Sequence, residues 1–250
     1  MAYEHDGKNY LIIGASSGIG ESIAIQLARD GASLAMLARR KDCMEQVRQS
    51  LTPGSHQIYP FDVSNLVDID RMVGTITADY PSISGCVYCA GVGDTSRLRD
   101  LSSERLHYVM QVNFYAFVEF VRCLVRRKKK ETEMRIVAIS SLASICNDKY
   151  FTPYAASKAA LDASVRCLAR ELASKKVTIN SIRPGVVNVA RLSALDELTG
   201  GLDEEIKRNG YQPLGLIPPE DIACMVSYLL SDSARFITGS NIPFNGGAAC

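Results

Sequence analysis

Short apolar runs alternate with amphipathic stretches along most of the chain. Apolar runs bounded by polar residues or glycine predict buried strands, whereas apolar residues repeated every three or four positions predict helices packed on a core. Strands are expected at residues 10–13, 33–38, 57–60, 85–89, 135–140, 177–182 and 241–244. Helices are expected after Gly20, at 42–51, 65–80 and 103–125, from Tyr154 onwards, and at 219–230.

This alternation of strand and helix requires parallel strands joined by right-handed crossovers. We therefore expect an α/β fold, a doubly wound (Rossmann) parallel sheet of about seven strands with helices on both faces. No repeat, low-complexity tract or linker divides the pattern, so residues 1–250 are expected to form one domain. Residues 186–218 have weaker periodicity and several breakers, which is typical of a substrate loop or lid.

Composition argues against several classes of partner. Hydrophobic residues make up 47% of the 250 residues, enough for a sizeable core, and the net charge of +1 creates no field to attract nucleic acid or an anionic membrane. The polar start, and the lack of an apolar stretch near the ~20 residues of a membrane span, predict a soluble, cytoplasmic protein. We expect neither a nucleic-acid nor a membrane partner.

The cysteines and histidines show no pattern of ligands. The eight cysteines are scattered without a framework of spacings, so we expect reduced thiols. Cys86 and Cys89 have the spacing of a redox or zinc pair, but residues three apart on a strand point to opposite faces. His5, His56 and His107 form no ligand cluster. No metal site is expected.

A glycine turn joins the first strand to the first helix. Gly14 allows a tight turn, Gly18 lets a diphosphate approach the backbone, and Gly20 allows close packing of the helix, whose N-terminus favours phosphate. The spacing is G-x3-G-x-G rather than G-x-G-x-x-G, so the turn alone is only moderate support for a dinucleotide site.

The same residues also fit the G-x-S-x-G elbow of serine hydrolases, with Ser16 as the nucleophile. Such an enzyme needs a histidine late in the chain, yet the sequence has none beyond His107. The elbow would also fall on the first strand, with no earlier loop to form an oxyanion hole. The hydrolase is therefore the weaker alternative.

Tyr154 and Lys158 are four residues apart, so on a helix their side chains share one face. An ammonium group near a phenol favours the phenolate, which makes the phenol a usable acid and base. Ser141 follows the apolar run 135–140, and its hydroxyl should lie at the carboxyl edge of a parallel strand, where α/β sheets place their chemistry. We predict that the three side chains converge.

The end of the second strand predicts the cofactor. NAD-selective sites place Asp or Glu there to bind both ribose hydroxyls, and that carboxylate repels a 2′-phosphate. This chain has Ala38, followed by Arg39 and Arg40, and a guanidinium can bind a phosphate with two parallel hydrogen bonds. We therefore expect NADP(H) rather than NAD(H).

Taken together, the glycine turn, Asn113, Ser141, Tyr154 and Lys158 resemble the short-chain dehydrogenase/reductase family along nearly the whole chain. In that family the serine lies thirteen residues before the tyrosine and the lysine four after it, as here. The ending is similar to that of 3-oxoacyl carrier-protein reductases. The resemblance implies a single dinucleotide-binding and catalytic domain, with these cofactor-binding residues: Gly14, Ser16, Ser17, Gly18, Ile19, Gly20, Arg39, Arg40, Asp62, Val63, Ala90, Gly91, Tyr154, Lys158, Pro184, Gly185 and Val187.

Three positions depart from the family pattern. Tyr88-Cys89-Ala90-Gly91 stands where the family usually has Asn-Asn-Ala-Gly, which removes an amide that ties strands together. Val189 replaces a threonine whose hydroxyl contacts the nicotinamide amide, and Asn245 replaces the aspartate of the usual Asp-Gly-Gly ending.

The implied reaction is reduction of a ketone or 3-oxoacyl carbonyl to an alcohol. Tyr154 would donate the proton, Ser141 would hydrogen-bond the carbonyl oxygen, and Lys158 would hold the nicotinamide ribose and stabilise the phenolate. Asn113 would position a water that relays protons to Lys158. The resemblance also implies a homotetramer or homodimer, because family members pair through the helix of Tyr154 and the long helix before it.

Two questions remain open at the level of sequence. A protein that senses the NADP pool without turnover is the alternative to an enzyme, and the departures at Cys89 and Val189 permit it. The substrate is a small carbonyl compound or alcohol, free or attached to an acyl carrier protein. The basic run 126–130 is expected to be a solvated helix end, with docking of an acidic carrier as the alternative.

Overall fold

The computed structural model describes residues 4–146, 149–189, 206–207 and 211–248. The strands are β1 (Asn9–Ile13), β2 (Ser33–Ala38), β3 (His56–Pro60), β4 (Gly85–Tyr88), β5 (Met134–Ile139), β6 (Val177–Pro184) and β7 (Asn241–Phe244). The α-helices are α1 (Gly18–Arg29), α2 (Lys41–Ser50), α3 (Ile69–Asp79), α4 (Ser103–Met110), α5 (Ala116–Arg127), α6 (Thr152–Leu172) and α9 (Pro219–Leu230). Shorter turns are the π-helical η3 (Gln111–Tyr115) and the 3₁₀ turns η1 (Leu66–Asp68), η2 (Leu98–Asp100), η4 (Leu142–Ser144), η5 (Ala173–Lys175) and η6 (Asp232–Ala234).

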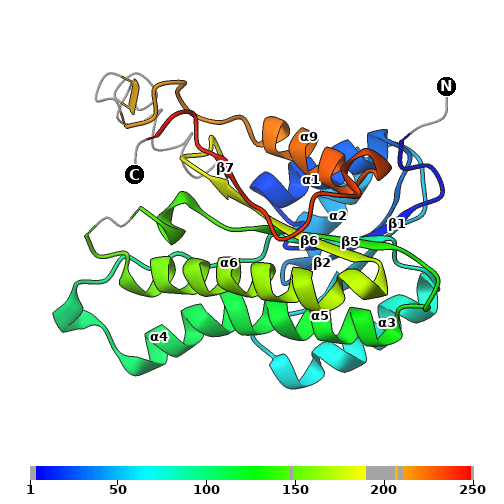
Figure 1. The fold of residues 1–250 in the computed structure, drawn as a ribbon, viewed down its shortest axis with the longest axis horizontal. Helices are drawn as coiled ribbons and strands as arrows, with labels where there is room; N and C mark the ends of the chain where they lie inside the picture. Colours follow the sequence, from blue (N-terminus) through cyan, green and yellow to red (C-terminus); the bar gives the residue numbers. More distant parts are fainter. Residues whose placement is uncertain (1–3, 147–148, 190–205, 208–210, 249–250) are drawn as a thin grey trace.

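The seven strands form one parallel sheet in the order β3-β2-β1-β4-β5-β6-β7. This confirms the doubly wound α/β fold expected from the sequence. The chain reverses direction across the sheet between β1 and β4, where Ile13 lies between Leu37 and Tyr88. In such sheets ligands bind beyond the carboxyl ends of the strands at this switch point. That edge faces left in Figure 1.

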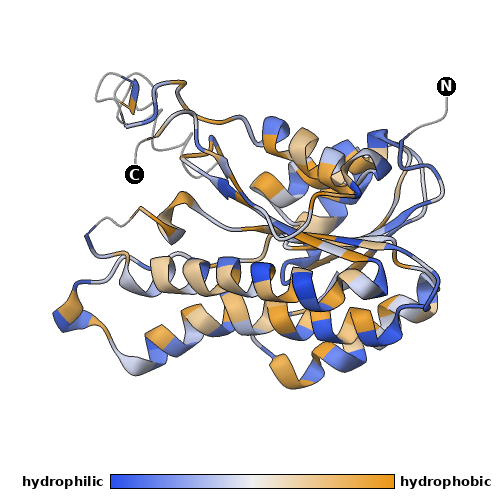
Figure 2. Cartoon of the chain, viewed as in Figure 1, coloured by the Kyte–Doolittle hydropathy of each residue, from blue (hydrophilic) through white to orange (hydrophobic). Residues whose placement is uncertain are grey.

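Two apolar cores enclose the sheet because successive strand residues point to opposite faces. Leu11 and Ile13 face the core under α3, α5 and α6, while Tyr10 and Ile12 face the core under α1, α2 and α9. Figure 1 shows these two helical layers on either side of the strands, and Figure 2 shows that apolar and polar residues alternate along the helices. The nearly continuous apolar runs in the strands follow from burial on both faces.

The helix expected at 103–125 continues without a break from Ser103 to Arg127, because η3 joins α4 to α5. By length and composition these 25 residues could cross a membrane, which corrects the expectation that no stretch approaches a membrane span. Half of the most apolar window is buried inside the fold. A core helix of a globular domain passes the same test, so the finding carries little weight for a membrane location.

A buried polar chain fastens the N-terminal segment to α9. The His5 ring places Nδ1 2.9 Å from the Tyr10 hydroxyl and Nε2 3.0 Å from the Ser227 hydroxyl, which donates to Asp30 at 2.7 Å. His5 is only 1% exposed. Burial lowers the pKa of His5 below its ordinary value of 6.5, and the attraction of Asp30 opposes this effect only in part.

The free energy of unfolding is expected to fall as the pH drops below 6.5. The unfolded chain binds a proton on His5 near that pH, whereas folded His5 binds it only at lower pH, so stability rises with pH through this window. Urea unfolding at pH 8, 6.5 and 5.5 tests this, and His5→Gln should flatten the dependence. His107→Gln is the matched control, because His107 is exposed on α4, away from these hydrogen bonds. Equal pH dependences for wild type and His5→Gln would contradict the assignment.

Candidate active site

The glycine turn between β1 and α1 has the geometry expected from its sequence. Gly14 has φ +95°, and a Cβ there would lie 2.6 Å from the Ala90 backbone nitrogen. A Cβ on Gly20 would lie 2.1 Å from the Gly14 carbonyl oxygen. Gly18 has φ +59°. The start of α1 therefore packs against Gly14, and Gly14 packs against the backbone that follows β4, an arrangement that side chains at Gly14 and Gly20 would obstruct.

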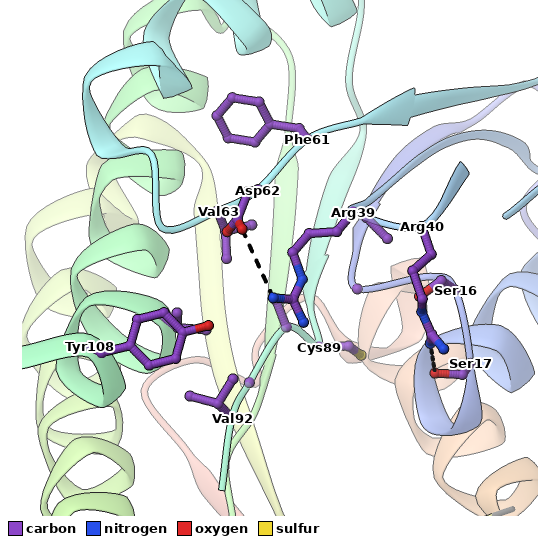
Figure 3. Close-up of a pocket in the computed structure, with 15 residues that line it drawn as sticks. Ser16, Ser17, Arg39, Arg40, Phe61, Asp62, Val63, Cys89, Val92 and Tyr108 are labelled. Carbon is purple, nitrogen blue, oxygen red and sulfur yellow. Dashed lines mark hydrogen bonds and ion pairs between the residues drawn. The ribbon is translucent and has the colours of Figure 1, made fainter. Parts of the chain in front are cut away.

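A cavity of about 230 Å³ opens beside this turn (Figure 3). It lies beyond the ends of β1, β2, β3 and β4, at the switch point of the sheet. Its lining residues are Gly14, Ser16, Ser17, Ala38, Arg39, Arg40, Phe61, Asp62, Val63, Cys89, Ala90, Gly91, Val92, Tyr108 and Val112. The lining includes most of the expected residues for the adenosine and phosphate half of a dinucleotide.

The two arginines after β2 reach this cavity from different directions. Arg40 donates to the hydroxyl of Ser17 at 2.9 Å and to that of Ser16 at 3.3 Å, so it lies against the glycine turn. Arg39 extends toward Asp62, with 3.9 Å between Nη1 and Oδ2, and keeps 61% of its side chain exposed. Figure 3 shows the two guanidinium groups on either side of the β2 end. Both guanidinium groups line the cavity, and their N–H groups are suited to binding a phosphate.

Tyr154 and Lys158 lie in the first turns of α6, as their spacing predicted. The Lys158 ammonium is 5.8 Å from the centre of the Tyr154 ring and donates to the Ile139 carbonyl at 2.8 Å. Lys158 is 4% exposed, whereas Tyr154 is half-buried. The ammonium is therefore fixed against the last residue of β5, next to the phenol.

Ser141 caps the short turn η4 directly after β5. Its hydroxyl oxygen accepts from the Ala143 N–H at 3.1 Å, which leaves the hydroxyl proton available to another acceptor. The residue follows Ser140, whose own hydroxyl points to the Lys158 carbonyl at 3.5 Å. Ser141 thus occupies the expected position at the carboxyl edge of the sheet.

Asn113 lies in the π-helical turn η3 and is completely buried. Its Oδ1 accepts from the Val92 N–H at 2.8 Å, and its Nδ2 donates to the Val92 carbonyl at 3.0 Å and the Ser157 hydroxyl at 2.9 Å. A Cβ on Gly91 would lie 3.4 Å from both Asn113 Oδ1 and Lys158 Nζ. Asn113 and Lys158 therefore both lie beside Gly91, in the loop after β4. Single π-helical turns are frequent at functional sites.

The remaining expected residues surround this centre. Val63, Ala90 and Gly91 line the cavity, whereas Ile19 does not contribute to it. Pro184 ends β6, Gly185 follows it, and Val187 pairs with Ile217 in an isolated parallel bridge. Most of the expected lid 186–218 lies outside the described residues, so its role stays a prediction.

Sequence reasoning missed several residues of the site. Val92 and Tyr108 line the cavity without having been expected there. Tyr108 and Val112 are four residues apart on the continuous helix and both line the cavity, so the shared helix face offered a signal for Tyr108. Gln212, 0% exposed and bonded to the Val186 backbone, gave no local signal in the sequence.

The cysteines confirm one expectation and correct another. Cys86 packs in the core under α3, α5 and α6, while Cys89 packs against the opposite core, so the two do not form a pair. Burial raises the pKa of the Cys89 thiol to about 12, only partly opposed by Lys158. Cys146, however, is bonded in a disulfide, which corrects the expectation that all cysteines are reduced. Its spacing to other cysteines gave no hint, because the fold alone brings half-cystines together.

The geometry around Ser16 does not support the hydrolase alternative. Ser16 accepts a hydrogen bond from Arg40, and no histidine takes part in the site. His5 bonds to Tyr10 and Ser227, and His56 lies 3.0 Å from the Thr52 carbonyl. Within the described residues, no group of three His, Cys, Asp or Glu side chains is arranged to hold a metal ion.

The basic run 126–130 is only partly the solvated helix end that was expected. Arg126 and Arg127 both pair with Asp70 of α3, and the Arg127 pair is 2.7 Å long. The run also lies beside the start of β5, at the edge of the sheet opposite the site (Figure 1). A carrier docked there would be separated from Ser141 by the whole length of β5, about 20 Å at ~3.3 Å per residue.

Comparisons with known proteins identify the family. The family model described as enoyl-(acyl carrier protein) reductase matches residues 14–249. The 3-oxoacyl-[acyl-carrier-protein] reductase FabG of Vibrio cholerae serotype O1 is 27% identical over 243 residues, 97% of either chain.

Solved structures agree with the sequence match. A short-chain type dehydrogenase/reductase from Mycobacterium ulcerans superimposes with a TM-score of 0.89 at 28% identity, over 98% of this chain and 90% of that one. L-sorbose reductase from Gluconobacter frateurii, solved with NADPH and L-sorbose, gives a TM-score of 0.92 at 24% identity, over 99% and 98% of the two chains. The fold, the match over nearly the whole chain and these likenesses show that the protein belongs to the short-chain dehydrogenase/reductase family of oxidoreductases.

Proposed function

We propose that the protein is an NADP(H)-dependent reductase that converts a ketone or 3-oxoacyl carbonyl to an alcohol. The observation that carries this proposal is the position of Lys158, which lies beside the Tyr154 ring and, with Asn113, beside Gly91 of the cavity lining. A phenol beside a buried ammonium is suited to proton transfer, and the cavity is suited to a dinucleotide.

The residues of the site fit a dinucleotide. A Cβ on Gly14 or Gly20 would collide with backbone atoms, so the turn exposes backbone at the N-terminus of α1, where a diphosphate binds. Asp62, Val63, Ala90 and Gly91 line the cavity beside the turn. When bound, the reduced cofactor supplies the hydride for carbonyl reduction.

Tyr154 is the proton donor in this proposal. Its phenol transfers a proton to the carbonyl oxygen, while the Ser141 hydroxyl donates a hydrogen bond to the same oxygen. Lys158 favours the phenolate left on Tyr154, and its remaining N–H groups can hold a ribose hydroxyl. Asn113 ties the Val92 backbone to Ser157 and so holds the loop after β4 against α6.

NADPH is expected to exceed NADH in kcat/KM by at least tenfold. Ala38 provides no carboxylate to repel a 2′-phosphate. Arg39 and Arg40 provide two guanidinium groups at the cavity, and each charged hydrogen bond to the phosphate would be worth about 1.5–3 kcal/mol. Arg39→Ala should erase most of this preference for NADPH over NADH. Steady-state kinetics with both cofactors measure it.

Arg71→Ala is the matched control for Arg39→Ala, because Arg71 is an exposed arginine of α3 that pairs with Asp68 and does not line the cavity. That variant should keep the wild-type preference. A wild-type preference for NADH would contradict the cofactor assignment, and an unchanged preference in Arg39→Ala would remove Arg39 from it.

A protein that senses the NADP pool is the second candidate. Val189 lies over Gly18 of the glycine turn, where the family hydroxyl would be, and the Cys89 thiol replaces an amide in the cavity. A sensor has no need of the proton donor, so the presence of Tyr154 and Lys158 favours the enzyme. A screen of ketones, keto sugars and 3-oxoacyl thioesters for NADPH oxidation separates the two: a sensor binds NADPH but consumes none.

Substrate, assembly and location follow from the same proposal. The named relative acts, by its name, on acyl groups attached to carrier protein, and we propose a small carbonyl substrate, free or attached to such a carrier. We also propose a cytoplasmic homotetramer or homodimer. Ala156, Ala159 and Ala163 are exposed along α6, where small side chains permit close approach of a second helix.

A further inference from the structure

The Gln212 side chain holds three backbone groups in the interior of the protein. Its Oε1 accepts from the Val186 N–H at 2.8 Å, and its Nε2 donates to the Val186 carbonyl at 3.0 Å and to the Gly215 carbonyl. Gln212 is 0% exposed, so none of these bonds can be replaced by solvent without opening the structure. The amide acts on Val186 as a neighbouring strand would, by satisfying both of its backbone groups.

Two glycines make room for this amide. A Cβ on Gly185 would lie 2.1 Å from Gln212 Oε1, and a Cβ on Gly246 would lie 2.8 Å from its Cγ. Side chains at either position would displace the amide from Val186. Gln212 therefore joins the segment after β6, the segment before α9 and the segment after β7.

The segment that Gln212 holds, residues 185–189, forms a wall beside the glycine turn. Val187 pairs with Ile217, with the Ile217 N–H bonded to the Val186 carbonyl at 3.0 Å and the Asn188 N–H bonded to the Ile217 carbonyl at 2.9 Å. Because backbone groups alternate in direction along a strand, the Val187 N–H points away from Ile217. Two residues later, Val189 Cγ1 lies 3.2 Å from the position of a Cβ on Gly18. The wall thus extends from β6 to the glycine turn.

We propose that Gln212 is a positioning residue that fixes residues 185–189 against the nicotinamide end of the bound cofactor. The inference rests on the proposed function, and it assigns to Gln212 no contact with the cofactor. Without the amide, the Val186 N–H loses its partner and the wall is free to move away from the nicotinamide, while the adenosine half of the cavity keeps all of its lining.

The test compares two ligands that differ only at the nicotinamide. Isothermal titration calorimetry gives the Kd of NADPH and of 2′-phospho-ADP-ribose, which lacks the nicotinamide ring, for wild type and for Gln212→Met. Methionine nearly matches glutamine in size but forms none of the three bonds. We expect Gln212→Met to weaken NADPH about tenfold and to change the affinity for 2′-phospho-ADP-ribose by less than twofold, because about 1.4 kcal/mol, the worth of one buried hydrogen bond, is a factor of ten.

Asn180→Leu is the matched control. Asn180 is another buried amide that holds two backbone groups, the Ile237 carbonyl at 2.8 Å and the Ser240 N–H at 3.1 Å, but it lies within β6, outside the cavity lining. Asn180→Leu should lower the melting temperature about as much as Gln212→Met does, and it should leave the ratio of the two Kd values unchanged. If Gln212→Met does not fold, Gln212→Asn, whose shorter side chain withdraws the amide from Val186, is measured in the same way with the same expected change of ratio.

Three results would overturn the proposal. Equal weakening of both ligands by the Gln212 variant, or no weakening of either, would show that Gln212 only stabilises the fold. If Asn180→Leu changes the ratio of the two Kd values as much as Gln212→Met does, Gln212 likewise only stabilises the fold. Failure of the wild-type protein to bind both ligands would instead remove the proposed function itself, which distinguishes the two failures.

Discussion

Replacing Tyr154 with phenylalanine is expected to abolish turnover while leaving the affinity for NADPH nearly unchanged. The substitution removes one hydroxyl from a half-buried ring beside the Lys158 ammonium and leaves the packing of α6 intact. Loss of a general acid typically lowers a rate about a hundredfold to ten-thousandfold. The measurement is kcat/KM on the best carbonyl substrate found, with the Kd of NADPH determined by titration.

Tyr150→Phe is the matched control for this experiment. Tyr150 lies four residues earlier, is 51% exposed, and contacts the chain through its backbone carbonyl, which accepts from the Ser96 N–H at 3.0 Å. Its phenol should be dispensable. If Tyr154→Phe keeps more than a tenth of wild-type activity, Tyr154 is not the proton donor.

Replacing Lys158 with methionine is expected to lower kcat/KM at least a hundredfold and also to weaken NADPH. The variant removes the charge that favours the Tyr154 phenolate, and it removes the donor to a ribose hydroxyl, worth about 1.5–3 kcal/mol or tenfold to a hundredfold in affinity. It also leaves the Ile139 carbonyl without its bond to Nζ. The same kinetics and titration measure both losses.

The two substitutions should therefore differ in what they lower. Tyr154→Phe should lower turnover alone, whereas Lys158→Met should lower both turnover and the affinity for NADPH. Because the two side chains act as a unit, the double variant should be little worse than the worse single variant. Lys175→Met, at an exposed position in η5 on the far end of α6, should change neither quantity. Unchanged NADPH affinity in Lys158→Met would contradict a ribose contact.

Features determined by neighbours in the sequence could be predicted. The seven strands and the helix Pro219–Leu230 appear where the apolar pattern placed them, because burial on both faces leaves a strong signal. Tyr154 and Lys158 share a face because four residues make about one helical turn. The glycine turn follows from the backbone freedom that its geometry requires.

Features determined by tertiary contacts could not be predicted. The π-helical turn around Asn113 depends on bonds to Val92 and Ser157, which are distant in the sequence. The pairing of Arg126 and Arg127 with Asp70 depends on how α5 packs against α3. The roles of the site residues stay predictions, because geometry alone does not report turnover.

The strand order has a consequence for how the chain folds. β1 lies between β2 and β4, so the first three strands and their helices can associate while one edge of β1 remains unpaired until residues 85–88 join it. Parallel sheets of this kind depend on pairings between distant segments, which makes folding slow and exposes apolar strand edges for longer. During synthesis at the ribosome, the chain thus passes through a stage in which three strands can pair and one edge of β1 is open. Chaperone binding is expected to concentrate at that stage, before residues 85–88 have been synthesised.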